Sequence, residues 1–290
     1  MRRLTPLIVA VAALTIVFTL LVVFVAATYA SGGRSLAPFR GAGTWVSIYD
    51  TAALRHPEAV VERLRAHGIH TLFLETSNDR QRSGVAHPVA TARFLNAAHR
   101  AGIDVVGWYL PSFVSPRADI RRSLQGARFR SPEGEGFDAF ALDIESTKVR
   151  SLRARTARAV AVARVVRAAL PRKLALGAIT IDPVGATYWR GYPFRTLARS
   201  VDIFLPMEYF TARTRGARRV AAYTAADIRL VRSLAGDSRF PVHPIGGEAR
   251  RASLAELRAF LHASRNEVGV SLWEYGETSG RQLKTLAAAR

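Results

Sequence analysis

The chain has 290 residues, enough for one large domain or two small ones, and its lack of cysteine excludes a fold held by disulfides. Its formal net charge is +20, and all but Lys148, Lys173 and Lys284 of its 42 basic residues are arginine. Such a charge suits nucleic acid, anionic lipid or an anionic cell wall. However, the basic residues are scattered and no nucleic-acid-binding motif accompanies them. We therefore predict arginine-rich, solvated helix faces and no nucleic-acid partner.

The N-terminal segment carries no charge from residue 4 to residue 33, directly after Arg2 and Arg3. A membrane-spanning helix needs about 20 apolar residues, so residues 1–30 are predicted to form a single-pass membrane anchor. The two arginines favour a cytoplasmic N-terminus, which places the remaining chain outside the cell membrane. A signal peptide cut after Ala30 is the alternative, and it predicts a secreted protein. Residues 31–41 are then a linker to a single domain over 42–290.

Within residues 42–290, short apolar runs alternate with helical patterns. Predicted strands cover 43–50, 69–76, 103–110, 137–145, 174–181, 201–209, 241–248 and 268–275. Predicted helices cover 57–68, 88–102, 116–125, 149–170, 190–199, 217–235, 253–264 and 279–289. This alternation indicates an α/β fold, a parallel (β/α)8 TIM barrel preceded by one transmembrane helix. An open doubly wound sheet is the alternative, but no glycine-rich phosphate loop follows the first strand.

Acidic and aromatic residues gather where the predicted strands end. They are Tyr49, Asp50, Glu75, Trp108, Tyr109, Asp143, Glu145, Asp182, Glu208, Tyr209, Glu248, Trp273 and Tyr275. The C-terminal ends of barrel strands carry the chemistry in this fold. Aromatic faces stack on sugar rings and carboxylates accept hydrogen bonds from hydroxyls, so we predict a sugar-binding site. His67 and His70 flank the start of a strand, at the opposite end, and we predict neither a metal nor a cofactor.

The stretch FDAFALDIES, residues 137–146, ends a buried strand with two acids. Asp143 and Glu145 are two residues apart and therefore face the same side of the strand. The charge of Asp143 raises the pKa of Glu145, which suits Glu145 to act as a general acid in glycoside hydrolysis. Ala139 and Ala141 then lie below the acids inside the barrel. The alternative is that the pair only caps the strand.

These residues resemble the strand-four motif D-x-x-D-x-D-x-E of the chitinase-like family 18 glycoside hydrolases. Asp138, Asp143 and Glu145 match it, and Ala141 replaces its central acid. The family's M-x-Y motif is found at Met207 and Tyr209, followed by Phe210 where an Asp is usual, and its strand-eight tryptophan resembles Trp273. The resemblance implies Glu145 as general acid, Asp143 and Tyr209 as ligands of a substrate N-acetyl group, and Trp273 and Met207 in the sugar site.

A second resemblance is to the lysozyme-like family 25 muramidases, which carry Asp-x-Glu on strand four and a W-Q-Y-like strand eight. The segment LWEYGE, residues 272–277, approximates the latter. Both resemblances imply a glycosidase acting on an N-acetylated cell-wall or chitin-type polysaccharide, including peptidoglycan. We also predict that the protein is a monomer. The alternative is a non-catalytic glycan-binding module, which the departures at Ala141 and Phe210 favour.

Overall fold

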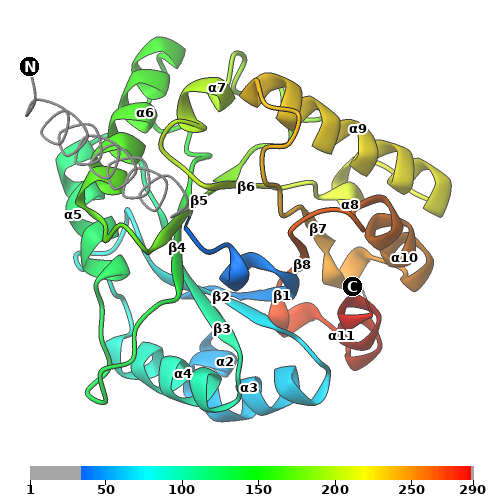
Figure 1. The fold of residues 1–290 in the computed structure, drawn as a ribbon, viewed down its shortest axis with the longest axis horizontal. Coiled ribbons are helices and arrows are strands. Elements are labelled where there is room, and N and C mark those ends of the chain that lie inside the picture. The colour runs from blue at the N-terminus through cyan, green and yellow to red at the C-terminus, as the bar shows by residue number, and fades with distance from the viewer. Residues whose placement is uncertain (1–33, 289–290) are drawn as a thin grey trace, which may run out of the picture. The chain divides into compact units, whose positions relative to one another are not determined.

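A computed structural model of the protein describes residues 34–288, and its helices and strands belong to one compact unit that begins at Leu36. An eight-stranded parallel sheet forms the centre of this unit (Figure 1). The strands are β1 (Gly41–Val46), β2 (Thr71–Asn78), β3 (Asp104–Leu110), β4 (Ala139–Asp143), β5 (Ala175–Thr180), β6 (Ile203–Pro206), β7 (Ile245–Glu248) and β8 (Gly269–Trp273). Their order, β6-β5-β4-β3-β2-β1-β8-β7, follows the chain around a ring.

The ring is nearly closed between β6 and β7. Two isolated parallel bridges, Phe204–Val242 and Met207–Ile245, join the two segments. The backbone N–H of His243 also donates to the carbonyl oxygen of Phe204 over 2.9 Å. The predicted α/β TIM barrel is therefore confirmed as the fold of this unit. Strand β7 starts at Ile245 rather than at the predicted residue 241, because Pro241 and Pro244 have no N–H to offer a sheet.

Helices surround the barrel and connect its strands (Figure 1). They are α2 (Thr51–Arg55), α3 (Pro57–Ala66), α4 (Pro88–Arg100), α5 (Pro116–Ala127), α6 (Leu152–Ala169), α7 (Phe194–Leu197), α8 (Phe210–Arg213), α9 (Ala217–Ala235), α10 (Leu254–Ala263) and α11 (Gly280–Ala287), with 3₁₀ turns η1 (Ala37–Phe39), η2 (Ala249–Arg251) and η3 (Tyr275–Glu277). Ser253 and Ser279 begin α10 and α11 with capping boxes. Gly68 and Gly102 follow α3 and α4 with φ of +73° and +70°, which is the predicted glycine stop.

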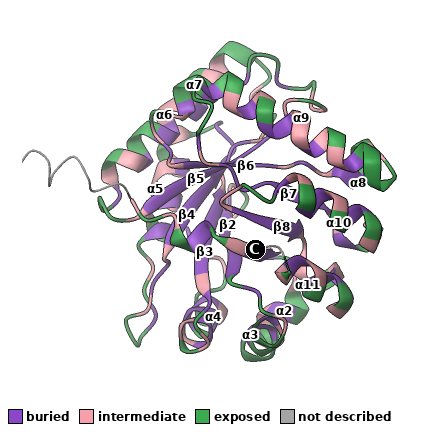
Figure 2. Cartoon of the chain, turned by 45° about the vertical axis from the view of Figure 1, so that its right-hand side comes forward, coloured by how far each residue is buried: buried purple, intermediate pink, exposed green. Residues whose placement is uncertain are grey.

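The strands are buried, whereas the outer faces of the surrounding helices are exposed (Figure 2). The strand side chains alternate between a hydrophobic layer inside the barrel and one against the helices. On β4, Ala139 and Ala141 pack inside the barrel, whereas Phe140 and Leu142 pack outward against the helices. All four side chains are fully buried. This alternation carries Asp143, two residues beyond Ala141, to the interior side at the end of the strand.

The predicted linker over residues 31–41 is too long at its C-terminal end. Residues 37–39 form η1, and the Phe39 side chain is fully buried in the barrel interior. The carbonyl oxygen of Pro38 accepts from Thr71 Oγ1 over 3.0 Å, and that of Phe39 lies 2.8 Å from His243 Nδ1. This segment therefore covers the N-terminal end of the barrel. The predicted anchor over residues 1–30 lies outside the described residues, and within 34–288 no helix has the length and hydrophobicity to cross a bilayer.

Candidate active site

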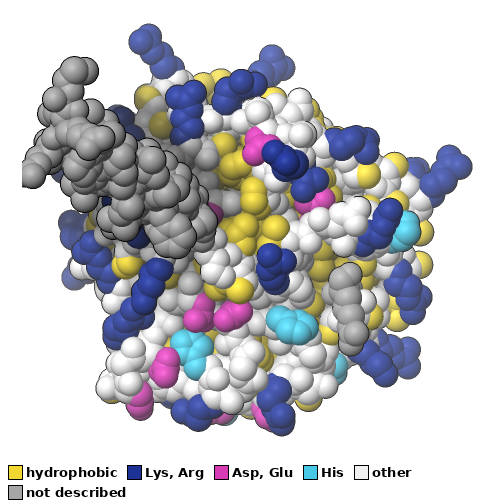
Figure 3. All heavy atoms as spheres, in the orientation of Figure 1, with side chains coloured by type: hydrophobic (Ala, Val, Ile, Leu, Met, Phe, Trp, Pro, Cys, Tyr) yellow, Lys and Arg dark blue, Asp and Glu magenta, His cyan; other side chains and the backbone are white. Residues whose placement is uncertain are grey.

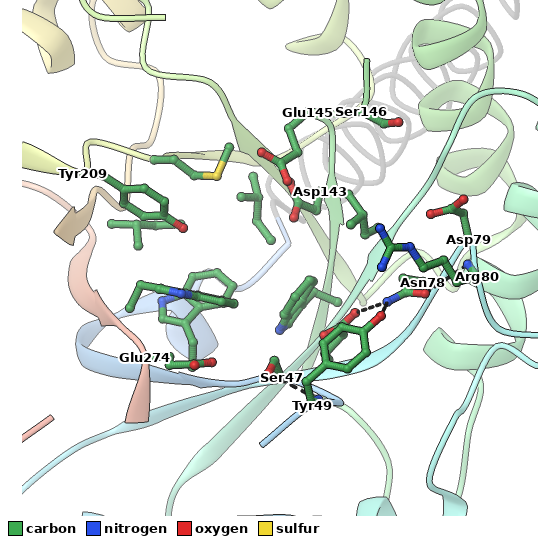
Figure 4. A pocket seen from close by; sticks show the side chains of 18 of the residues that line it. Ser47, Tyr49, Asn78, Asp79, Arg80, Asp143, Glu145, Ser146, Tyr209 and Glu274 are labelled. Carbon is green, nitrogen blue, oxygen red and sulfur yellow. Dashed lines mark hydrogen bonds between the residues drawn. The ribbon is translucent and has the colours of Figure 1, made fainter. Parts of the chain in front are cut away.

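A cavity of about 970 Å³ opens at the C-terminal ends of the strands (Figure 4). Eight of the predicted site residues line it, namely Tyr49, Glu75, Trp108, Asp143, Glu145, Met207, Tyr209 and Trp273. They come from six different strands or the residues just beyond them, and both members of the Asp143–Glu145 pair are included. The structure therefore brings the two acids and the aromatic residues together at one place.

Three other predicted site residues lie at the same end of the barrel but serve local structure. Asp50 caps α2, its Oδ1 accepting from the N–H of Ala53 over 2.9 Å. Glu248 accepts from Arg251 over 3.2 Å, and the Tyr275 ring packs under the guanidinium of Arg63. None of the three lines the cavity.

Tyr109, Asp182 and Glu208 point away from the cavity. The Tyr109 hydroxyl donates to Asp119 of α5 over 2.9 Å, because Trp108 takes the inward position on β3. Asp182 binds the Arg213 guanidinium over 3.0 Å. Glu208 is fully buried, with burial and the nearby Asp227 charge raising its pKa well above the usual value. The predicted sugar-binding role is therefore not supported for these three side chains.

Both carboxyls of the Asp143–Glu145 pair have raised pKa values. Burial raises the pKa of Glu145, and it raises that of Asp143 well above the usual value, with further contributions from the charges of Glu145 and Glu75. Asp143 is 7% exposed, and its Oδ1 has no hydrogen-bond partner within residues 34–288. Two carboxyls that repel each other in a buried site retain a proton at a pH where an exposed carboxyl has lost it.

Two further carboxyls, Glu75 and Glu274, line the same cavity. Figure 4 shows Glu274 below the Asp143–Glu145 pair in that view. Burial raises the pKa of Glu75 to about 7, although its oxygens accept from the N–H of Ile48 over 3.0 Å and from Asn78 Nδ2 over 3.1 Å. Burial and the charge of Asp50 raise the pKa of Glu274. The cavity is therefore lined by five carboxyls. Asp79 forms an ion pair with Lys148, whereas Glu75, Asp143, Glu145 and Glu274 form none among the described residues.

Aromatic rings form the floor and the mouth of the cavity. The rings of Trp45, Trp108 and Trp273 lie with their centroids 5.9–6.1 Å apart. Tyr49 and Tyr188 also line the cavity and are 58% and 42% exposed, so their faces are accessible to a ligand. A floor of tryptophans beneath carboxyl groups, with exposed tyrosines above, is suited to sugar rings.

Several lining residues were not predicted from the sequence: Trp45, Ser47, Asn78, Asp79, Arg80, Leu110, Ser146, Thr147, Lys148, Ile179, Tyr188 and Ile245. Glu274, an acid at the end of the eighth predicted strand, also lines the cavity. Two short runs, 78–80 and 146–148, directly follow Glu75 and Glu145 along the chain. Their position after a strand-end acid is a signal that could have found them. Tyr188 lies on the loop between β5 and α7 and has no comparable signal.

No protein-family model matches the chain, and no curated protein matches its sequence. Solved structures do match. An endo-β-1,4-mannanase from Thermotoga petrophila superposes with a TM-score of 0.64 at 12% identity, covering 82% of this chain and 68% of that one. A chitinase from Bacteroides thetaiotaomicron gives 0.62 at 10% identity, covering 86% and 95%. The Bacillus cereus spore cortex-lytic enzyme SleL gives 0.60 at 12% identity, covering 85% and 73%. The predicted resemblance to TIM-barrel glycoside hydrolases is thus confirmed at the level of the fold.

Proposed function

We propose that this protein is a glycoside hydrolase that cleaves an N-acetylated glycan of the cell-wall or chitin type. The observation that carries the proposal is the Asp143–Glu145 pair, which lies in an aromatic-lined cavity at the barrel end with the pKa of both carboxyls raised. A protonated carboxylic acid beside a second carboxyl is what protonation of a glycosidic oxygen requires.

In the mechanism implied by the resemblance to family 18, Glu145 donates its proton to the leaving oxygen as the bond from that oxygen to C1 breaks. The carbonyl oxygen of the substrate's own acetamide bonds to C1, and Asp143 holds the acetamide N–H with help from the Tyr209 hydroxyl. Water then attacks C1 and gives a proton to Glu145, while the bond from C1 to the acetamide oxygen breaks; the acetamide and the protonated Glu145 are thus restored. General acid–base catalysis of this kind contributes about 10²–10⁴-fold in rate.

The proposed substrate class draws on both the cavity and the structural neighbours. Among the structural neighbours are a chitinase, a spore cortex-lytic enzyme and a mannanase. An N-acetyl group gives Asp143 and Tyr209 a defined ligand, whereas a mannan offers none. We therefore place N-acetylated glycans first and expect the protein to act without a cofactor.

The proposed location is the outer side of the cell membrane, with residues 1–30 as a single-pass anchor. A cell-wall glycan is accessible from that side. Protease added to intact cells should then remove the barrel, and a barrel that survives while the cells stay intact would contradict this location.

Hydrolysis by the purified full-length chain tests the proposal. Reducing ends released from chitin oligomers and from peptidoglycan are measured beside β-mannan, which lacks acetamide groups. Turnover of either N-acetylated glycan above that of mannan supports the proposal, and turnover of mannan alone contradicts it.

A glycan-binding module without activity is the second candidate, and two positions favour it. Ala141 stands where the resemblance expects an acid, and Asp143 Oδ1 above it has no hydrogen-bond partner among the described residues. Phe210 packs on Phe260 in the outer core and brings no carboxyl to the cavity. Binding of a chitin oligomer without release of reducing ends from any tested glycan would identify the module.

A further inference from the structure

The cavity lining includes two cations that differ in how they are paired. Lys148, just beyond β4, forms an ion pair with Asp79, just beyond β2. Arg80 is exposed, and its side chain has no acidic partner within residues 34–288. Figure 4 shows the Arg80 side chain extending past Asn78 into the cavity. The Arg80 guanidinium is therefore accessible to a ligand in the cavity.

The backbone at Arg80 is held by residues of the cavity itself. Asn78 Oδ1 accepts from the N–H of Arg80 over 3.0 Å. The Asn78 side chain also donates through Nδ2 to the Tyr49 hydroxyl over 2.9 Å and to Glu75 over 3.1 Å. The N–H of Asp79 donates to the carbonyl oxygen of Leu110 on β3 over 3.0 Å. The base of the arginine is thus fixed relative to the acids and aromatic rings.

The charge balance of the cavity leaves Arg80 available for an external anion. Five carboxyls line the same space, yet none of them forms an ion pair with Arg80 among the described residues, and Asp79 is already paired with Lys148. Because burial raises the pKa of Glu75, Asp143 and Glu145, these groups keep their protons to a higher pH than exposed carboxyls do, which weakens their repulsion of an incoming anion. A guanidinium binds a carboxylate through two parallel hydrogen bonds, which a lysine cannot reproduce.

We propose that Arg80 binds a carboxylate carried by the glycan, so that the preferred substrate is an acidic polysaccharide. This inference rests on the proposed function and assigns the substrate class of the same cavity. The net charge of +20 agrees with it, and Figure 3 shows basic side chains projecting around the molecule in that view. A field of this sign raises the local concentration of a polyanion, while Arg80 supplies recognition at one position.

Two kinds of glycan carry the required carboxylate, and separate probes distinguish them. Peptide-free peptidoglycan strands bear a lactyl carboxylate on every second sugar, and chitin oligomers of equal length share their backbone but lack this group. Oligomers that alternate glucuronic acid with N-acetylglucosamine bear a uronic carboxylate, and their carboxyl-reduced forms are the matched neutral probes. Affinities are measured by titration calorimetry on the full-length chain carrying Glu145→Gln, which prevents hydrolysis.

We expect at least one acidic probe to bind about tenfold more tightly than its neutral partner. Arg80→Gln should remove that ratio, and Arg80→Lys should restore only part of it. Arg82→Gln is the matched control, because Arg82 is exposed on the same loop and does not line the cavity. It should keep the ratio, which separates local recognition from the effect of net charge.

Equal affinity for acidic and neutral partners, or an equal loss of the ratio in Arg80→Gln and Arg82→Gln, would overturn the assignment to Arg80. If the wild-type chain hydrolyses neutral chitin oligomers in that case, the proposed function holds and only the role of Arg80 is rejected. Absence of binding to every probe would overturn both. A second series in the wild-type background, read as the ratio of kcat/KM for acidic and neutral probes, checks the result independently of Glu145→Gln.

Discussion

The acidic residues at the two ends of the barrel differ in whether they form ion pairs. At the N-terminal end, Asp138, Asp202 and Glu267 lie one or two residues before β4, β6 and β8, and each contacts a cation. Their partners are His99 at 3.0 Å, Arg167 at 3.5 Å and Arg232 at 2.7 Å. At the C-terminal end, four of the five cavity carboxyls form no ion pair among the described residues, although the chain has 42 basic residues; they are Glu75, Asp143, Glu145 and Glu274. The fifth, Asp79, lies just beyond β2 and is paired with Lys148.

This difference agrees with the proposed function, in which the C-terminal end of the barrel carries the chemistry. A buried carboxyl without a cation lowers the free energy of unfolding at neutral pH, because its charged form is poorly solvated. A strongly basic chain could have paired these groups, as it does for Asp182 and Glu248 outside the cavity. Unpaired carboxyls at the barrel mouth are therefore consistent with a catalytic role, at a cost in stability.

The largest expected effect is on activity at the C-terminal end. Glu145→Gln should lower kcat for an N-acetylated glycan by about 10²–10⁴-fold, since the amide cannot donate the proton. Glu208→Gln is the matched control, because Glu208 is a buried strand-end acid outside the cavity. Release of reducing ends measures both variants. Loss of turnover in Glu208→Gln alone would mean that the acid lies on β6.

Asp143→Asn should lower kcat and also move the basic limb of the pH–rate profile to lower pH, by about one unit or more. Loss of the last proton from the pair would place a second negative charge beside the first, and this repulsion raises the pKa for that loss. Replacing Asp143 with a neutral amide removes the repulsion and therefore lowers the pKa. A full pH–rate profile of both proteins measures the shift. An unchanged or upward-shifted basic limb would show that the two carboxyls do not interact.

Glu75 should make stability fall as pH rises from about 4.5 to about 7. Its pKa is raised in the folded state, so the folded chain holds a proton that the unfolded chain has already lost. The upper limit of the loss is about 3 kcal/mol, from a shift of this size. Urea unfolding across this window should show a smaller decline for Glu75→Gln than for the wild type. Equal declines would mean that Glu75 is solvated.

The smallest expected effect lies at the N-terminal end. Hydrogen bonds and charge from Asp138 and then Glu135, against the opposing effect of burial, raise the pKa of His99 to about 9. The stabilisation is complete below pH 6.5 and is lost as pH rises through 9, because the unfolded histidine loses its proton first. Since the site is only half-buried, we expect about 2 kcal/mol or less. In His99→Gln, the free energy of unfolding in urea should vary less with pH between these values, and kcat should be unchanged. A fall in kcat would mean that His99, at the N-terminal end of the barrel, affects the cavity at the other end.

The sequence was sufficient to predict the barrel and the inward direction of Asp143, because strand alternation is regular within β4. The same alternation could have excluded Tyr109, since Trp108 and Tyr109 are neighbours on β3 and face opposite sides. The alternation could not predict the side-chain directions of Asp182 and Glu248. These residues lie at or past the strand ends, where loop geometry and nearby arginines determine the direction of a side chain. Arg80 was missed because β2 extends to Asn78, two residues further than predicted.

The most direct test of the central claim is a crystal structure of Glu145→Gln with a bound N-acetylglucosamine tetramer. The account predicts a sugar ring stacked on Trp273, its acetamide bonded to Asp143 and Tyr209, and a glycosidic oxygen within hydrogen-bond distance of residue 145. A tetramer bound outside this cavity, or bound in it with the glycosidic oxygen away from residue 145, would contradict the account.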